Sequence, residues 1–456
     1  MAYRSINPYT EQQVAAFDTL DDAGLEPLLA RAHAAFRDDW SQRPVDARAK
    51  VLRQASALIR ERRQEIAGIV TTEMGKLLRE ALVEVDFCAE VFAYYADNAA
   101  QMLAPREIAS SRGRAVIETA PLGVIFCVEP WNFPIYQLTR VAAPNLAAGN
   151  TLLVKHASNV PQCALAFEAV LRDAGAPDGA YLNAFVSAQQ AKAIIADARV
   201  RGVALTGSEK AGASVAASAG AALKKSTMEL GGSDPFIVLD DADLDLAVRL
   251  AVAGRTVNAG QACNAAKRFI IADALADAFN VAFAGALSAL RPGDPMDPST
   301  TLAPLSSQEA LEGVLDQIDK AVEAGAVLQL GGERVPGRGF FLRPTILSNV
   351  EPDNPAYRQE FFAPVAQVFR VPDDEAAIAL ANDSDFGLGA TIVSRDIARA
   401  SHVASRLESG MVCINETGVS APDLPFGGVK NSGYGRELSD YGIHEFVNKK
   451  MVKYPG

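Results

Sequence analysis

The sequence predicts an α/β protein built on doubly wound parallel sheets, and three observations support this fold class. The first hundred residues repeat apolar side chains at helical spacing. From about residue 114 onward, short runs rich in Val and Ile alternate with helical stretches, as in sheets covered by helices on both faces. The length of 456 residues exceeds one ordinary core and indicates roughly two to three folding units.

The predicted elements follow in order along the chain. Apolar stripes with a period of three and four predict core-facing helices over residues 25–36, 51–59 and 66–70. The predicted strands include residues 122–128, 151–155, 202–206, 236–239, 269–271, 390–393 and 411–414. Because ligands bind beyond the carboxyl ends of parallel strands, the segments that follow these runs are the places to look for chemistry.

Two segments depart from this alternation. Residues 106–121 are polar around a turn at 110–113, and residues 446–456 place three lysines among apolar residues. Both can be edge strands that add to the sheet of another subunit. A surface hairpin and a frayed chain end explain the same pattern equally well.

Composition excludes several classes of partner. The net charge is −12 and no stripe of Lys and Arg appears, which argues against nucleic-acid binding. No apolar run approaches the ~18 residues that cross a bilayer, and the first eight residues offer no signal peptide. We therefore expect a cytoplasmic protein with neither a nucleic-acid nor a membrane partner. The five cysteines and four histidines are scattered, so neither disulfides nor a metal site is predicted.

Cys263 is the candidate nucleophile. It follows a helix-like stretch that begins near residue 242 and precedes the predicted strand 269–271. Gly260 interrupts the helix just before the thiol, so we expect Cys263 in a connection rather than in a core. Near exposed backbone N–H groups a thiol can have a lowered pKa and react as a thiolate. The alternative is a small buried side chain without chemistry.

Glu229 and Asn132 are the candidate partners of the thiol. Glu229 lies between Met228 and Leu230, so apolar neighbours should desolvate it and raise its pKa toward the range useful for proton transfer. Asn132 follows the predicted strand 122–128, where its amide can stabilise a developing oxyanion. A buried, ion-paired glutamate and a turn-forming asparagine are the alternatives.

Together these side chains describe a reaction at a carbonyl group. A thiolate adds to the carbon, Asn132 and the Cys263 backbone N–H hold the oxyanion, and Glu229 activates water. The oxidant would bind at residues 205–212, where a strand, a glycine turn and a helix N-terminus form a geometry that receives a diphosphate. The segment is not a GxGxxG motif, and alone it is a weak signal.

Five motifs resemble the aldehyde dehydrogenase superfamily in order and spacing. Three contain the candidate catalytic residues, at 130–134 (PWNFP), 229–232 (ELGG) and 260–263 (GQAC). The others are 360–365 (EFFAPV) and 425–433 (PFGGVKNSG). The resemblance spans residues 5 to 450 and is closest to the short bacterial succinate-semialdehyde dehydrogenases, through residues 155–160 and 231–236.

The resemblance implies two Rossmann-like domains and a small β element for oligomerisation. The dinucleotide-binding domain would comprise residues 1–103 and 122–231, and the catalytic domain residues 232–444. The oligomerisation strands would be residues 104–121 and 445–456, in a homodimer or homotetramer.

The resemblance also implies roles for individual residues. Cys263 would be the nucleophile, Asn132 the oxyanion donor and Glu229 the base for thioester hydrolysis, with a nicotinamide dinucleotide as oxidant. The residues that would hold this dinucleotide are Trp131, Lys155, Ser158, Gly207, Ser208, Gly212, Glu360 and Phe362.

One departure from the family pattern concerns the choice of cofactor. The family often has an acid three residues after the ribose-binding lysine, and this chain has Ser158 at that distance from Lys155. A carboxylate would repel a 2′-phosphate, whereas a hydroxyl can donate a hydrogen bond to it. The sequence therefore allows either NADP or NAD.

The substrate is predicted from one cation. Arg140 lies eight residues beyond Asn132, on a helix that should line the substrate tunnel together with Tyr136. It matches an arginine that binds the substrate carboxylate in semialdehyde dehydrogenases. A second arginine of some relatives would fall at Val257 and is absent, although Ser420 can compensate. Succinate semialdehyde is the predicted substrate, and glutarate semialdehyde or an uncharged aliphatic aldehyde is the alternative.

Three other functions are less consistent with the sequence. A cysteine hydrolase without a nucleotide would need a histidine near Cys263, and none lies in the five motifs. A catalytically silent homologue would not be expected to keep Cys263, Glu229 and Asn132 together. CoA-acylating relatives lack the acid that Glu229 supplies.

Overall fold

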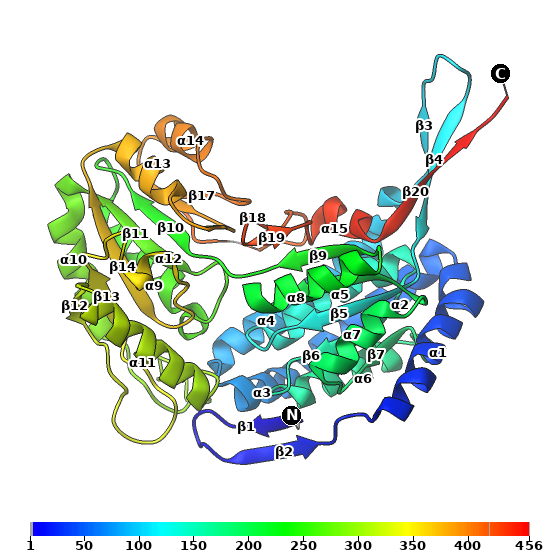
Figure 1. Cartoon of the computed structure of the whole chain (residues 1–456), viewed down its shortest axis with the longest axis horizontal. Helices are drawn as coiled ribbons and strands as arrows, with labels where there is room; N and C mark the ends of the chain where they lie inside the picture. The colour runs from blue at the N-terminus through cyan, green and yellow to red at the C-terminus, as the bar shows by residue number, and fades with distance from the viewer. Residues whose placement is uncertain (1–2, 419, 456) are drawn as a thin grey trace.

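The chain folds into two α/β lobes and a small sheet that projects from one of them (Figure 1). A computed structural model describes residues 3–418 and 420–455. The predicted α/β class with parallel sheets is confirmed. No helix among the described residues is both long and apolar enough to cross a membrane.

The first lobe contains a six-stranded sheet. Its order is β19-β9-β8-β5-β6-β7, and all neighbours are parallel except the antiparallel pair of β19 and β9. The strands are β5 (Val124–Glu129), β6 (Thr151–His156), β7 (Tyr181–Asn183), β8 (Val200–Thr206), β9 (Lys225–Glu229) and β19 (Gly433–Tyr434).

Helices cover both faces of this sheet. Ile125 and Cys127 of β5 point toward one face and Val124 and Phe126 toward the other, so a continuous apolar run is buried on both sides. The first face packs against α2 (Val45–Glu61), α3 (Arg63–Met74), α4 (Leu78–Met102), α5 (Pro134–Ala148) and α6 (Pro161–Asp173). The second packs against α1 (Asp22–Asp38), α7 (Ala188–Ala196) and α8 (Glu209–Ala221).

The second lobe contains a seven-stranded sheet in the order β12-β13-β14-β11-β10-β16-β17. Only the pair of β12 and β13 is antiparallel. The strands are β10 (Asp234–Val238), β11 (Ala266–Ala272), β12 (Val327–Leu330), β13 (Thr345–Ser348), β14 (Val365–Val371), β16 (Thr391–Val393) and β17 (Cys413–Ile414). Helices α9 (Leu244–Thr256) and α10 (Asp273–Ser288) cover one face, and α13 (Asp374–Asn382) and α14 (Ile397–Ala404) the other.

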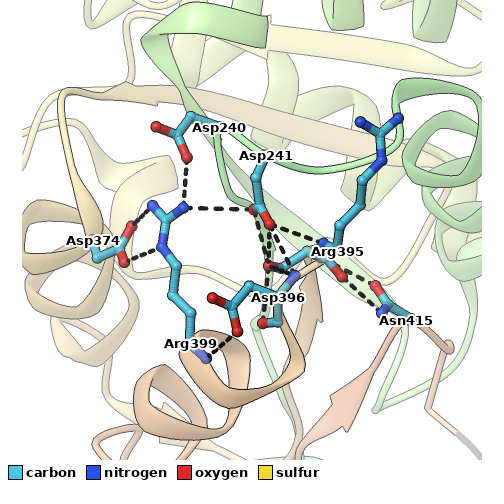
Figure 2. A network of polar contacts seen from close by, with 8 residues as sticks. Asp240, Asp241, Asp374, Arg395, Asp396, Arg399 and Asn415 are labelled. Atoms are coloured by element: carbon cyan, nitrogen blue, oxygen red, sulfur yellow. Dashed lines mark hydrogen bonds and ion pairs between the residues drawn. The ribbon is translucent and has the colours of Figure 1, made fainter.

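A network of charged groups fastens α13 and α14 to this second sheet (Figure 2). The Arg399 guanidinium binds both carboxylate oxygens of Asp374 at 2.6 and 2.7 Å and one of Asp240 at 2.6 Å. Asp241, just beyond β10, accepts hydrogen bonds from the backbone N–H groups of Arg395 and Asp396. The carboxyl ends of β10 and β16 are thereby joined to the helices that cover them.

The projecting sheet has three strands in the order β20-β4-β3 (Figure 1). The strands β3 (Arg106–Ile108) and β4 (Ala115–Pro121) form the predicted polar hairpin. The strand β20 (Val447–Lys453) pairs antiparallel with β4 along its full length. The tail is therefore a strand and not a frayed end.

The structure departs from the sequence predictions in two places. An antiparallel pair of β1 (Tyr3–Ile6) and β2 (Gln13–Phe17) precedes the first helix, where no strand was predicted because polar residues interrupt the pattern. The strand β19 falls within the predicted catalytic domain but belongs to the first sheet. Gly433 makes this pairing possible, since a Cβ there would lie 1.9 Å from the Met228 carbonyl oxygen.

Candidate active site

Three segments meet where the carboxyl edge of the first sheet faces the second lobe. They are the loop between β5 and α5 with Asn132, the end of β9 with Glu229, and the segment after α9 with Cys263. The Asn132 amide nitrogen donates to the Gln261 carbonyl oxygen at 3.1 Å. A Cβ on Gly232 would lie 2.6 Å from the Cys263 carbonyl oxygen, so only glycine allows this approach. The three predicted catalytic motifs are thus brought together.

Cys263 lies in a connection between α9 and β11, as predicted, and is half-buried. Just before it, Asn258 and Ala259 adopt left-handed backbone conformations with φ of 52° and 53°. Lys267 holds the segment from the other side, because its ammonium donates to the carbonyl oxygens of Ala262 and Cys263 at 2.9 and 2.7 Å. The backbone around the thiol is therefore fixed at both ends.

The expected lowering of the Cys263 pKa is wrong for this arrangement. Burial raises the pKa of the thiol to about 12, although the charges of Arg140 and Lys267 oppose the shift. Desolvation disfavours the thiolate more than these two cations favour it. The thiol therefore keeps its proton near neutral pH, and a reaction at Cys263 requires removal of that proton.

Glu229 is buried at the end of β9, with 2 % of its surface exposed. Burial raises its pKa well above the ordinary value, as the apolar neighbours in the sequence predict. Arg140 opposes this shift and Glu437 adds to it. A carboxyl group with a raised pKa is suited to proton transfer.

A row of polar side chains runs along the carboxyl edge of the first sheet. Glu129 ends β5 and is paired with His156 of β6, and Thr206 of β8 is paired with Glu229 of β9. Because Val128 is paired with Leu205, Glu129 and Thr206 are also neighbours. In-register parallel strands place all four side chains on one face. These polar side chains are therefore concentrated at the carboxyl edge of an otherwise apolar sheet.

The turn between β8 and α8 is open and leads into a helix N-terminus, in the segment that the sequence predicted to bind a diphosphate. Ser208 caps α8, and its hydroxyl accepts a hydrogen bond from the Ala211 N–H at 3.3 Å. A Cβ on Gly207 would meet only Leu205 at 3.6 Å, which leaves the turn open. Gly212 lets the helix pack tightly, since a Cβ there would lie 2.5 Å from Leu230. The open turn and the helix N-terminus fit an anionic ligand.

Lys155 and Ser158 lie at the carboxyl end of β6, next to the N-terminal strand. The Lys155 ammonium is 5.6 Å from the centroid of the Tyr3 ring, and burial lowers its pKa. The Ser158 carbonyl oxygen accepts a hydrogen bond from the Arg4 N–H at 2.9 Å. The strand β1, which was not predicted from the sequence, therefore lies against the predicted adenosine site.

Trp131, Glu360 and Phe362 lie beside the catalytic segments. The rings of Trp131 and Phe362 meet edge to face, with centroids 5.7 Å apart. Glu360 accepts a hydrogen bond from the Gly232 N–H at 3.1 Å and pairs with Lys267 at 3.0 Å. These residues come from both lobes, so they suit a ligand that lies between the two sheets.

The three predicted substrate residues lie together on and near α5. Burial raises the pKa of Tyr136, while the neighbouring Arg140 and Ser420 oppose the shift. Arg140 is buried, forms an ion pair with Glu437 and donates to the Thr206 hydroxyl at 3.1 Å. The structure therefore shows Arg140 paired within the fold. Its role toward a substrate stays a prediction.

Comparison with known proteins agrees with this geometry. The profile of the Aldehyde dehydrogenase family matches residues 1–452. The chain belongs to the aldehyde dehydrogenase family. The resemblance stated from the five sequence motifs is confirmed.

Relatives of this aldehyde dehydrogenase cover nearly its whole length. The succinate-semialdehyde dehydrogenase [NADP(+)] of Deinococcus radiodurans is 50 % identical over 451 residues, which are 99 % of this chain and 94 % of that protein. The succinate semialdehyde dehydrogenase [NAD(P)+] Sad of Escherichia coli is 46 % identical over 98 % of this chain and 97 % of its own. The crystal structure of succinic semialdehyde dehydrogenase from Streptococcus pyogenes in complex with NADP+ superposes with a TM-score of 0.98, 46 % identity and full coverage of both chains.

Sequence reasoning missed several charged residues of this aldehyde dehydrogenase. Lys267 contacts the segment that carries Cys263, Glu437 pairs with Arg140, and Glu129 stands in the polar row, yet none was singled out. Lys267 had a usable signal, because a charged residue inside the apolar strand β11 must find a partner when buried. Glu437 had none, since it reaches Arg140 from a distant loop.

Proposed function

We propose that this aldehyde dehydrogenase oxidises succinate semialdehyde to succinate and uses NADP, with NAD as an alternative cofactor. The observation that supports the reaction most directly is the meeting of the segments that carry Cys263, Asn132 and Glu229 at one edge of the first sheet. Relatives of 46 % and 50 % identity that carry this activity in their names support the substrate. The cluster of Tyr136, Arg140 and Ser420 supports an ω-carboxylate.

The residues of the chain perform the acyl transfer. The Cys263 thiol transfers its proton to a water molecule, and its sulfur forms a bond to the aldehyde carbon. The Asn132 amide and the Cys263 backbone N–H hold the resulting oxyanion. After oxidation, Glu229 takes a proton from water, whose oxygen attacks the thioester and releases the carboxylic acid and Cys263.

A dinucleotide fits the edge formed by β6 and β8. In this proposal Lys155 and Ser158 face the adenosine ribose, Ser208 faces the diphosphate, and Trp131, Glu360 and Phe362 surround the nicotinamide end. When bound, the cofactor supplies the two-electron oxidation that the side chains cannot provide. Ser158 in place of an acid avoids charge repulsion with a 2′-phosphate, which supports NADP.

In the proposed complex the substrate carboxylate meets Tyr136, Ser420 and Arg140. Glu437 already balances the charge of Arg140, so the substrate must share the guanidinium with it. Two hydroxyl groups in the same cluster can donate hydrogen bonds to the carboxylate. The position of Arg140 therefore supports its role toward the carboxylate, while the hydroxyl groups of Tyr136 and Ser420 form the direct hydrogen bonds to it.

The test is a steady-state panel of aldehydes with both cofactors. Succinate semialdehyde, glutarate semialdehyde and butanal are compared with NADP and with NAD at equal ionic strength. The proposal expects the highest kcat/KM for succinate semialdehyde with NADP. A higher value for butanal would contradict the substrate, and no oxidation with either dinucleotide would contradict the enzyme class.

The assembly and location are part of the same proposal. We infer that the β20-β4-β3 sheet joins subunits into a homodimer or homotetramer, because β20 presents an open edge and an exposed Met451. Five described cysteines are free thiols, which supports a reducing, cytoplasmic setting. Light scattering of the wild type and of Met451→Glu tests the assembly, and an unchanged mass for this variant would contradict the role of β20.

A further inference from the structure

The N-terminal part of α4 contacts the loop of the first lobe that carries Asn132 and the segment of the second lobe that carries Cys263. It carries Glu80 and Glu84 four residues apart, a spacing that places them on one face of the helix. Lys76, just before the helix, pairs with Glu84, and each side chain has only 1 % of its surface exposed. These three residues lie outside the five sequence motifs.

Glu84 fixes the start of α5. One of its carboxylate oxygens accepts hydrogen bonds from the N–H groups of Ile135 and Tyr136 at 2.9 and 3.0 Å. Phe133, at the N-cap, makes no side-chain capping bond of its own. Glu84 therefore supplies the cap from another helix and holds α5 directly after Asn132.

Lys76 adds to the contacts that Glu84 makes with the start of α5. Its ammonium binds the second carboxylate oxygen of Glu84 and lies 3.6 Å from the centroid of the Phe133 ring. The lysine thus contacts the residue next to Asn132 through a cation–π interaction. A buried ion pair with additional hydrogen bonds is rigid, because neither charge can move without losing its partner.

Glu80 contacts the second loop. Its carboxylate accepts a hydrogen bond from the Asn258 N–H at 3.3 Å. Burial raises the pKa of Glu80, and the nearby charge of Lys76 opposes this shift. Asn258 has the left-handed φ of 52°, a conformation that persists when the surroundings hold it.

Asn258 connects the contacts made by Glu80 to the loop that carries Asn132. Its amide nitrogen donates to the Asn132 carbonyl oxygen at 2.8 Å and to the Gln261 carbonyl oxygen at 3.1 Å. Gln261 returns a hydrogen bond to the Asn258 carbonyl oxygen at 3.1 Å. A continuous set of contacts therefore runs from α4 to Asn132 and to the segment two residues before Cys263.

We propose that Lys76, Glu80 and Glu84 are positioning residues that set the oxyanion donor Asn132 against the nucleophile Cys263. The inference rests on the proposed roles of Asn132 and Cys263. It goes beyond them, because it assigns the alignment of the two loops to a helix that touches no reacting atom. Misplacement of reacting groups by about 1 Å is expected to cost around 100-fold in rate.

The first test measures the alkylation of each cysteine by iodoacetamide in the full-length protein, resolved by mass spectrometry. Glu80→Leu and Glu84→Leu are compared with Glu90→Leu, a matched change at an exposed position of the same helix. Local loosening should accelerate the alkylation of half-buried Cys263 at least about fivefold in the first two variants. Cys88, Cys127 and Cys163 are fully buried and report general unfolding.

Two labelling results would overturn the proposal. One is a Cys263 rate equal to that of the Glu90→Leu variant. The other is a rise at Cys263 that is matched by the three buried cysteines, because that pattern indicates unfolding of the whole lobe. This readout needs no aldehyde, so it decides the inference even if the proposed substrate is wrong.

The second test measures the pre-steady-state burst of reduced cofactor, scaled to titrated active sites. Glu84→Leu should lower the burst rate constant about 10- to 100-fold, with dinucleotide affinity little changed. Glu84→Gln keeps an acceptor oxygen for the α5 N–H groups and should recover most of the rate. The double variant Lys76→Met/Glu84→Leu removes the unpaired charge and should regain thermal stability without regaining the rate. A wild-type rate in this double variant would overturn the proposal, and no burst in the wild type would instead contradict the proposed function.

Discussion

Arg140 and Glu437 form an ion pair in which 1 % and 9 % of the two side-chain surfaces remain exposed. The ring of Phe426 lies against the guanidinium, with its centroid 4.4 Å from the central carbon. A buried charge without a partner is costly, so each member of the pair requires the other. The pair also lies among Glu129, Glu229 and Thr206, which makes it part of the electrostatic setting of the catalytic base.

Arg140→Leu should separate the two roles of this arginine. If it also binds the substrate carboxylate, kcat/KM for succinate semialdehyde should fall by about one to two decades, which corresponds to one charge-assisted hydrogen bond. Activity on butanal, scaled to titrated active sites, should be unchanged or higher. Steady-state kinetics on both aldehydes provide the measurement.

The control for this variant is the double change Arg140→Leu/Glu437→Gln. The single variant leaves Glu437 buried without a partner and should lose on the order of 3–5 kcal/mol of stability. The double variant should recover much of that loss, as measured by denaturant unfolding. Parallel losses on the two aldehydes in the double variant would show that Arg140 acts only within the fold.

Cys263→Ala should abolish aldehyde oxidation while dinucleotide binding stays close to that of the wild type. Only the covalent step is removed, since the backbone contacts of Lys267 to this segment do not involve the sulfur. Binding is followed by fluorescence titration and activity by absorbance of the reduced cofactor. Appreciable turnover by this variant would refute the thioester route.

Glu229 should give the deacylation step a dependence on pH. A base works only when deprotonated, and burial raises the pKa of Glu229, so the steady-state rate should fall as the pH falls through this raised value. Glu229→Gln should slow turnover at every pH and leave a burst of reduced cofactor if acylation remains fast. Stopped-flow absorbance across the pH range provides the measurement, and a simultaneous loss of the burst would show that Glu229 also activates the thiol.

The same carboxyl group should affect stability with a defined sign. Its folded-state pKa is raised above the unfolded value of about 4.3, so the folded state binds the proton more tightly. Its contribution to stability is therefore present at low pH and is lost as the pH rises through the folded pKa. The difference in Tm between Glu229→Gln and the wild type should accordingly grow in favour of the variant as the pH rises.

Ser158→Glu should discriminate between the two cofactors. A carboxylate about 4 Å from a 2′-phosphate costs on the order of several kcal/mol at an effective dielectric near 20. The KM for NADP should rise much more than the KM for NAD. Ser158→Gln, which has a similar size and no charge, serves as the control. Equal effects on the two cofactors would show that Ser158 does not face the ribose.

The sequence predicted the sheets better than their edges. Runs such as 124–128 in β5 are continuous and apolar because the strand is buried on both faces. Such a strand can be predicted from its own sequence, without knowledge of the strand that pairs with it. The two-residue strand β19 has no such pattern, because its existence depends on Met228 from a distant segment. The pair of β1 and β2 was not predicted for a similar reason, since Arg4 and Ser5 interrupt any apolar run.

The predicted site shows the same division. Cys263, Glu229 and Asn132 were identified because each lies in a short motif beside a strand end, and the structure brings their segments together. The partners of these residues were not identifiable. Glu84 and Glu437 lie 48 residues before and 305 residues after Asn132, and Cys263 has a raised pKa because of burial that no local pattern specifies.

The pairing of β19 with β9 has a consequence for the order in which the protein is made. About 200 residues separate these two strands in the chain, which corresponds to roughly 10 to 40 s of translation at 5–20 residues per second. Throughout that interval β9, which ends in the catalytic base, has an open edge on the emerging polypeptide. The interval between the synthesis of β4 and that of its partner β20 is even longer. A nascent chain stalled before residue 433 should therefore be a target for chaperones, because it exposes two unpaired strand edges on an otherwise folded lobe.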